Sequence, residues 1–263
     1  MHKYHGTMVD KTRDDLGVIE VVDDATSRSL HFGSDPKQSS MLLRDPNYLE
    51  LVYTRAMACA LLFSADTRRF LLIGLGGGSL AKFLLHHFPH CRIDAVEYRQ
   101  AVSDVAHRHF FLPHDERLRI IIDDGGHFMR TADMADYSEY DAIYVDAFLG
   151  DGIARTVCGI SFYESCRDRL AEGGVLSMNL WNGDFIRARD MLDDIRASFD
   201  GNVLQLPVEG KDNIIAIATK GKPKLKKRLR QLEVEARELE RLTGVEYLLF
   251  LRQLRKHNKL LPF

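Results

Sequence analysis

The chain has 263 residues, of which 45% are hydrophobic and 28% charged, and its formal net charge is −2. This composition excludes a disordered protein, because so apolar a chain buries enough surface to offset its ordering entropy. No apolar run reaches the roughly 20 residues of a membrane helix, so we expect no membrane association. The four cysteines form no close CxxC pair, which argues against a disulfide framework and a zinc site. Residues 1–10 show no secretory leader, so we expect a reducing cytoplasm.

Charge is unevenly distributed along the chain. Residues 220–263 hold 13 Lys and Arg residues and 5 Glu, whereas residues 1–219 hold 23 basic and 33 acidic residues. An acidic body attracts cationic ligands. The basic segment is more typical of a solvated helix face than of a nucleic-acid contact, so we expect no nucleic-acid partner.

Residues 1–45 have the pattern of a small N-terminal β-unit. Two β-like runs, 16–22 and 29–32, are separated by the turn-rich residues 23–27, which favours a hairpin or a small antiparallel sheet. Apolar residues at helical spacing then predict a helix over 48–63.

Residues 46–219 alternate apolar β-runs with helical stretches. The predicted strands are Phe70–Gly74, Arg92–Val96, Leu118–Ile122, Ala142–Val145, Gly174–Met178 and Ile214–Ala218, and the helices between them include Ser79–Phe88, Ala101–Phe110 and Phe185–Phe199. This alternation is typical of a doubly wound α/β fold with a mostly parallel sheet. Residues 220–263 predict a C-terminal helical extension, with helices over 223–243 and 245–257.

A glycine-rich turn follows the first predicted strand of this sheet. Gly74, Gly76, Gly77 and Gly78 lie between that strand and a helix that begins at Ser79. Glycines allow a tight turn there and a close approach of the backbone to a ligand lying over the strand ends. A simple strand–helix turn would also account for them.

Acidic residues end the next three strands. Glu97 ends the second strand, about 20 residues beyond the glycines. A carboxylate at this position is well placed to accept hydrogen bonds from both hydroxyls of a ribose. Asp124 follows the third strand, in Asp123-Asp124-Gly125, and Asp146 follows the fourth. Because parallel strands end at one edge of the sheet, we expect these acids to line a nucleoside site, with Asp124 near an adenine amino group.

Phosphate binding is the rival use of such a loop. The chain has no GxxxxGK[ST] motif, and the third glycine of a GxGxxG fingerprint would fall on Ser79 or later. Carboxylates repel phosphate, so a nucleoside without phosphates fits these strand ends better.

These motifs together resemble the spermidine synthase (polyamine aminopropyltransferase) family. The residues that carry the resemblance are Gly74-Leu75-Gly76-Gly77-Gly78, Glu97, Asp124-Gly125, Tyr140-Asp141-Ala142-Ile143-Tyr144-Val145-Asp146 and Leu170-Ala171-Glu172-Gly173-Gly174-Val175-Leu176, and the similar region covers about 12–220. The resemblance implies the fold of S-adenosylmethionine-dependent methyltransferases and a homodimer. It also implies an amine or polyamine acceptor. We expect no metal, because the histidines, clustered at 86–90 and 107–114, lie at a helix end and on a helix with its following turn, with no sign that they converge.

The resemblance also assigns roles to single residues. Glu97 would hold the ribose, Asp124 with Gly125 the adenine, and Gly76–Gly78 the methionine-derived arm. Asp146 would stand where the family keeps its catalytic aspartate. Tyr48 would stand where a tyrosine lines the polyamine pocket.

The chain departs from the family pattern mainly in the acceptor half. Ser79 stands where the family's GGGDGG loop has an aspartate, and Leu149 replaces the second aspartate of the catalytic segment, so that Asp151 alone stands near it. Residues 206–211 replace a PTYPSG-like segment. Asp151 and Glu209 are candidate helpers of Asp146, and Trp181 is a candidate wall of the acceptor pocket.

Three functions therefore stay open. The first is transfer of an aminopropyl group from decarboxylated S-adenosylmethionine to an amine. The second is methyl transfer from S-adenosylmethionine, whose carboxylate an aspartate at position 79 would repel and Ser79 does not. The third is nucleoside binding without turnover.

Overall fold

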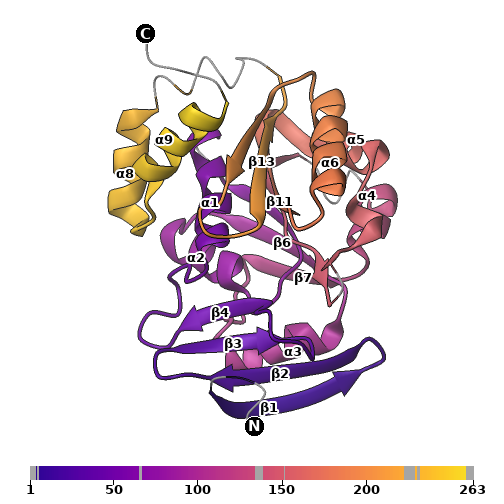
Figure 1. Ribbon diagram of the computed structural model, residues 1–263, viewed down its shortest axis with the longest axis vertical. Coiled ribbons are helices and arrows are strands. Elements are labelled where there is room, and N and C mark those ends of the chain that lie inside the picture. Colours follow the sequence, from indigo (N-terminus) through magenta and orange to yellow (C-terminus); the bar gives the residue numbers. More distant parts are fainter. Residues whose placement is uncertain are drawn as a thin grey trace.

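The structure is a computed structural model that describes residues 4, 6–64, 67–133, 139–150, 152–221, 229 and 232–258. Its centre is a seven-stranded sheet with the strand order β12-β13-β11-β8-β5-β6-β7 (Figure 1). The strands are β5 (Arg69–Ile73), β6 (Arg92–Glu97), β7 (Leu118–Ile122), β8 (Tyr140–Val145), β11 (Leu170–Trp181), β12 (Val203–Pro207) and β13 (Asn213–Thr219). All pairs are parallel except those that β13 makes with β11 and β12. The predicted doubly wound, mostly parallel sheet is confirmed.

Helices cover both faces of this sheet. The helices α4 (Gly125–Thr131), α5 (Ile160–Arg169) and α6 (Phe185–Ser198) lie on one side (Figure 1). The other side carries α1 (Val52–Ala58), its 3₁₀ continuation (Cys59–Phe63), α2 (Ser79–His87), α8 (Glu233–Thr243) and α9 (Tyr247–His257). Among the helices of the described ranges, none combines the length and the apolarity that a membrane span requires.

Successive side chains of β5 point to opposite faces of the sheet and pack into two different hydrophobic clusters. Phe70 and Leu72 pack into the cluster on the α1 side, whereas Leu71 and Ile73 pack into the cluster on the α5 side. All four are almost fully buried, as a strand covered on both faces requires.

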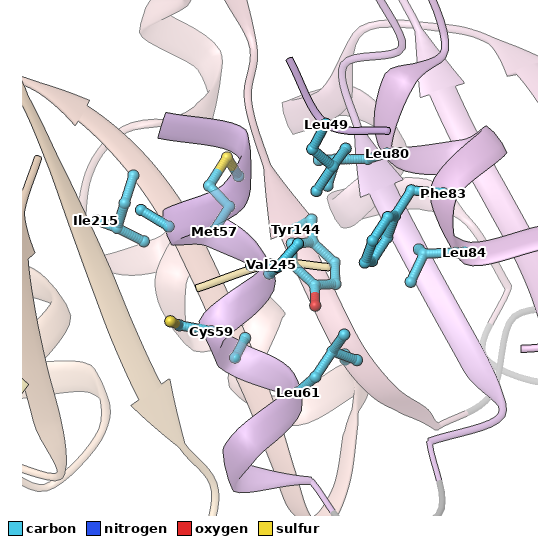
Figure 2. Close-up of a cluster of buried hydrophobic side chains, with 14 of the residues drawn as sticks. Leu49, Met57, Cys59, Leu61, Leu80, Phe83, Leu84, Tyr144, Ile215 and Val245 are labelled. Atoms are coloured by element: carbon cyan, nitrogen blue, oxygen red, sulfur yellow. The ribbon is translucent and has the colours of Figure 1, made fainter. Parts of the chain in front are cut away.

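The C-terminal helices belong to the larger of these clusters. Figure 2 shows Val245, which precedes α9, among Met57, Cys59 and Tyr144 from elements far away in the sequence. The buried α9 side chains, Leu251 among them, join the same cluster. The helical extension therefore shares its core with the central sheet.

A second sheet is formed by the N-terminal residues. It contains β1 (Thr7–Asp14), β2 (Gly17–Asp23), β3 (Ser27–His31) and β4 (Ser39–Leu42), all antiparallel. Its apolar face packs on α3 (Gln100–His109). Arg99, which is 5% exposed, fixes this contact, because its guanidinium binds Asp14 at 2.7 Å and lies 4.6 Å from the ring centre of Phe32.

Element boundaries differ from the prediction in a few places. The helix expected from Tyr48 begins at Val52, because Leu51 is extended at the N-cap, and it tightens into a 3₁₀ turn at Cys59. The N-terminal unit has four strands, and the predicted strand 174–178 extends over Leu170–Trp181. Of the helix expected over 223–243, the described part is α8, whereas residues 222–228, 230 and 231 lie outside the described residues.

Candidate functional site

A cavity of about 1220 Å³ lies at the carboxyl ends of the parallel strands. Its wall is built from the turn after β5, the ends of β6, β7, β8 and β11, and the start of β13. The loop between β3 and β4, the start of α1 and the hairpin of β9 (Phe148–Leu149) and β10 (Gly152–Ile153) are further parts of the wall. Open α/β sheets bind ligands at this edge, in the crevice where the strand order reverses on either side of β5.

Gly74 brings the end of β8 against the end of β5. Its φ of +97° is in the left-handed region, and a Cβ there would collide with the backbone oxygen of Asp146. The Asp146 N–H donates to the Ile73 carbonyl at 2.8 Å, which continues the ladder to this point. Only glycine at position 74 allows the two strand ends to approach so closely.

Glu97 is buried behind the glycine turn. Its Oε2 accepts from the backbone N–H groups of Leu75 at 3.0 Å and Gly76 at 3.4 Å, and its Oε1 accepts from the Arg99 N–H at 2.9 Å. Burial raises the pKa of this carboxyl, and the three N–H donors act against that rise. A carboxylate oxygen accepts more than one hydrogen bond, so Glu97 retains acceptor capacity for a diol in the cavity.

Asp124 and Gly125 form the wall after β7. Asp124 caps α4, because its Oδ1 accepts from the His127 N–H at 2.8 Å, and its Oδ2 accepts from the Thr156 hydroxyl at 2.7 Å. A Cβ at Gly125 would collide with Ile73, so glycine at this position allows the start of α4 to pack closely on the end of β5.

Asp146 is the centre of a hydrogen-bond network from four elements. Its Oδ1 accepts from Asn179 Nδ2 at 2.8 Å, and its Oδ2 accepts from the Tyr53 hydroxyl at 3.1 Å. Asn179 in turn accepts from Asn213 Nδ2 at 2.9 Å, so its amide orientation is fixed. Burial raises the pKa of Asp146, while the bonds from Asn179 and Tyr53 lower it. The arrangement holds one carboxylate at a fixed angle in the cavity wall.

Ser79 lies at the start of α2, where the cavity meets the N-terminal sheet. Its hydroxyl donates to the Ser40 carbonyl at 3.3 Å and lies 3.2 Å from the Ser39 hydroxyl. This part of the wall therefore offers neutral hydroxyl groups. Ser79 lines the cavity, as do Gly74, Gly76, Glu97, Asp124, Gly125, Asp146 and Trp181 from the predicted set.

Four predicted residues lie elsewhere. The ring of Tyr48 packs 5.5 Å from the Arg55 guanidinium instead of lining the cavity, because it precedes the helix that Tyr53 belongs to. Glu209 is exposed and accepts from Gln253 of α9 at 3.3 Å.

Gly77 and Gly78 are the other two. A Cβ on Gly77 would meet Ser39 and Phe110, and one on Gly78 would meet Leu112. Both glycines thus allow close packing of α2 and do not line the cavity among its described wall residues. Asp151 lies outside the described residues.

Three residues at Asp146 were missed by the sequence analysis. Tyr53 belongs to the predicted helix, but the apolar pattern does not fix where that helix begins. Asn179 stands two residues before Trp181 on one strand, so the period of two places both on one face. Asn213 starts an antiparallel strand, and only the register Trp181↔Asn213 brings it to this edge.

Metal-ligating side chains do not gather within the described ranges. No group of three or more His, Cys, Asp or Glu residues there is arranged to hold a metal ion.

Comparisons with known proteins agree with this geometry. The family model described as "Spermine/spermidine synthase domain" matches residues 50–207. A polyamine aminopropyltransferase of Chromobacterium violaceum is 35% identical over 246 residues, which are 92% of this chain and 90% of that protein.

Solved structures share the fold. A probable spermidine synthase from Corynebacterium glutamicum superposes with a TM-score of 0.71 at 21% identity, over 89% of this chain and 87% of that one. Human methyltransferase-like protein 13 in complex with SAH superposes with a TM-score of 0.64 at 25% identity, over 74% of this chain and 93% of that one.

Proposed function

Because the chain belongs to the spermine/spermidine synthase family, we propose that it transfers an aminopropyl group from decarboxylated S-adenosylmethionine to an amine. The observation that carries the proposal is the position of Asp146. Its hydrogen-bonded carboxylate lies in the cavity wall between two regions. One contains Glu97 and Asp124 at the ends of β6 and β7, and the other is formed by β11 and β13. A base in that position meets an acceptor amine next to a bound sulfonium nucleoside.

The donor half of the cavity fits a nucleoside. In this proposal Glu97 accepts from the ribose hydroxyls, and Asp124 with Gly125 borders the adenine. Gly74 and Gly76 support the glycine turn beneath the sulfur. Glu97 lines the cavity and retains acceptor capacity beside its three backbone donors, which favours a ligand that carries a diol.

The chemistry requires alignment and one proton acceptor. The amine nitrogen bonds to the carbon next to the sulfonium, and the broken C–S bond leaves its electron pair on sulfur, giving a neutral thioether. The new ammonium releases one proton, which Asp146 accepts or passes on. Tyr53 and Asn179 hold the carboxylate in place for this step.

Methyl transfer from S-adenosylmethionine remains the second candidate, and Ser79 is the observation that favours it. The wall around Ser79 offers hydroxyl groups from Ser39 and Ser79 itself, and a donor carboxylate is not repelled by them. The reaction is then the same displacement with a methyl carbon as the electrophile.

Donor preference tests the proposal. The full chain is titrated by calorimetry with S-adenosylmethionine, its decarboxylated form and methylthioadenosine. We expect the decarboxylated donor to bind most tightly. Tighter binding of S-adenosylmethionine would contradict aminopropyl transfer and favour methyl transfer. If none of the three compounds binds, the assignment of the cavity as a nucleoside site is wrong.

An Asp146→Asn variant separates an enzyme from a nucleoside-binding protein without turnover. We expect it to keep donor affinity and to lose about 10²- to 10⁴-fold in kcat, the usual contribution of a positioned acid or base. A measurable rate that does not change in this variant would contradict the role of Asp146. A homodimer, a cytoplasmic location and a helper role for Asp151 also stay predictions.

A further inference from the structure

The helix that carries Tyr53 is held differently at its two ends. The last turn of α1 is fixed by packing, because Ala56, Met57 and Ala58 are buried in the larger hydrophobic cluster. The first turn, which contains Tyr53, has less local support. Its N-cap residue, Leu51, makes no side-chain capping bond, and the turn contains no acidic side chain. The start of α1 therefore depends on contacts from outside the helix.

Arg55 connects the first turn of α1 to the segment before it. Its side chain is 12% exposed, and its Nη1 donates to the carbonyls of Leu49 at 2.8 Å and Glu50 at 2.7 Å. The same guanidinium lies 5.5 Å from the ring centre of Tyr48. One side chain thus fixes residues 48–50 against the beginning of the helix.

The orientation of Arg55 is set by the C-terminal helices. Its Nε donates to Oε2 of Glu246 at 3.0 Å. Glu246 is the N-cap residue of α9, but its side chain makes no capping bond and binds Arg55 instead. Val245 before it and Tyr247 after it are fully buried, so the backbone at this point is fixed. The ion pair therefore joins a rigid point of the C-terminal extension to the uncapped start of α1.

Arg55 and Tyr53 leave this turn in different directions. Residues two apart on a helix do not face each other. Arg55 contacts the extension, whereas Tyr53 lines the cavity and donates to Asp146 Oδ2 at 3.1 Å. This distance already exceeds the usual O–H···O distance of about 2.7–2.8 Å. A shift of the turn away from Glu246 would therefore weaken the bond to Asp146 further.

We infer that the C-terminal extension positions the catalytic carboxylate, with Glu246 and Arg55 as positioning residues that hold Tyr53 on Asp146. The inference rests on the proposed function. Neither positioning residue belongs to the described wall of the cavity, so both act through α1 and not on a substrate. The ion pair keeps the first turn where the Tyr53 hydroxyl donates to Asp146, which holds the carboxylate at its angle toward the acceptor amine.

A double-mutant cycle tests the path from Glu246 to Asp146. Glu246→Ala is made in the full chain and again in the Tyr53→Phe background. Formation of methylthioadenosine from decarboxylated S-adenosylmethionine gives kcat with the faster of the acceptors 1,4-diaminobutane and 1,5-diaminopentane. We expect a loss of about fivefold in the first background and of less than about twofold in the second, because residues of one network couple. An equal loss in both backgrounds would mean that Glu246 does not act through Tyr53, and would overturn the inference.

The pH profile separates positioning from a general loss of stability. Tyr53 is one of the donors that lower the pKa of Asp146, so a weaker bond should move the acid limb of kcat/KM to higher pH in Glu246→Ala. Glu246→Gln should stay closer to the unaltered chain, because its amide oxygen still accepts from Arg55. A loss of rate in Glu246→Ala with an unmoved limb would contradict the inference.

Glu233→Ala is the matched control. Glu233 binds Arg255 at 2.7 Å, a bond that joins α8 to α9 and not to α1. Its side chain is exposed to a similar degree, 55% against 43% for Glu246. We expect this variant to keep its kcat and its acid limb. The same shift of the limb in both variants would mean that any loosening of the extension is sufficient, and would overturn the assignment to Glu246.

A readout without turnover separates this inference from the proposed function. Hydrogen exchange of peptides that cover residues 50–58 reports how often the first turn of α1 opens. We expect faster exchange there in Glu246→Ala and unchanged exchange in Glu233→Ala. If neither diamine yields methylthioadenosine, the proposed function fails, and faster exchange in Glu246→Ala alone still supports the hold of the extension on α1. Unchanged exchange in Glu246→Ala overturns it.

Discussion

Asp146 is held between two opposing influences on its pKa. Burial at the end of β8 favours the protonated carboxyl and raises the pKa, whereas the donors Asn179 and Tyr53 favour the ionised form. A carboxyl whose pKa is raised in the folded state loses stability as the pH rises from its unfolded-state pKa to the raised one, and the full cost is present above the raised pKa. We therefore expect Asp146→Asn to melt at or above the temperature of the unaltered chain at neutral pH, although it loses activity.

The pH dependence of the reaction follows from the same balance. Because Asp146 must be ionised to accept a proton, kcat/KM should fall as the pH drops through its raised pKa. Asn179→Ala removes a donor that lowers this pKa, so the acid limb of the profile should move to higher pH. Tyr53→Phe should move it in the same direction. A uniform loss of rate with an unmoved limb would contradict the role given to these bonds.

Ser79 is the residue that most directly tests donor choice. In Ser79→Asp, a carboxylate of S-adenosylmethionine would meet a like charge at a cost of about 1 kcal/mol or more, whereas the decarboxylated donor meets a counterion for its amine. We expect the ratio of the two dissociation constants to shift about fivefold or more toward the decarboxylated donor. The control is Ser79→Asn, which has the same shape without the charge, and calorimetry measures both. An equal shift in the control would contradict the electrostatic explanation.

At the scale of the elements, the junction of β5 and β8 determines the site. In Gly74→Ala the new Cβ would collide with the Asp146 backbone, and alanine at a φ of +97° is strained. We expect about a 10²-fold loss in kcat, because misplacing a reacting group by about 1 Å costs that much.

The matched control for this junction is Gly173→Ala. Its φ of +77° makes alanine strained there too, but no atom of the described residues lies within 4 Å of the added Cβ. We expect Gly173→Ala to lose stability, measured by thermal melting, and to keep its activity, measured by initial rates. Equal losses of activity in both variants would mean that backbone strain, and not the approach to Asp146, causes the effect.

The sequence predicts the elements better than it predicts the contacts between them. The sequence alone predicts that Glu97, Asp124 and Asp146 lie close together, because parallel strands end at one edge of a sheet and each acid ends or follows a strand. Tyr48 was assigned to the acceptor pocket by the family resemblance. Tyr53 was missed because helical periodicity leaves open where the helix begins, and therefore which of its side chains reach the strand ends. Asn213 depends on an antiparallel register, which no local pattern specifies.

At the scale of the molecule, the C-terminal helices and the central sheet share one hydrophobic cluster. Leu251 of α9 is 1% exposed within that cluster, whereas Leu249 of the same helix is 46% exposed. We expect Leu251→Ala to destabilise the whole chain by about 2–5 kcal/mol, and Leu249→Ala to change its stability by less than about 1 kcal/mol.

Two spectroscopic probes check this coupling. Circular dichroism follows the helices, and fluorescence follows Trp181, the single tryptophan of the chain, at the cavity. Coincident transitions are expected, because one core unfolds in one step. An earlier, separate loss of helix signal would mean that the extension folds as a unit of its own.

The identity of the donor product tests the central claim most directly. The full chain is incubated with decarboxylated S-adenosylmethionine and with S-adenosylmethionine in turn, each with 1,4-diaminobutane and 1,5-diaminopentane as acceptors, and the nucleoside product is identified by mass spectrometry. Aminopropyl transfer predicts methylthioadenosine, an acceptor heavier by one aminopropyl group, and loss of both in Asp146→Asn. Formation of S-adenosylhomocysteine with a methylated acceptor would contradict it.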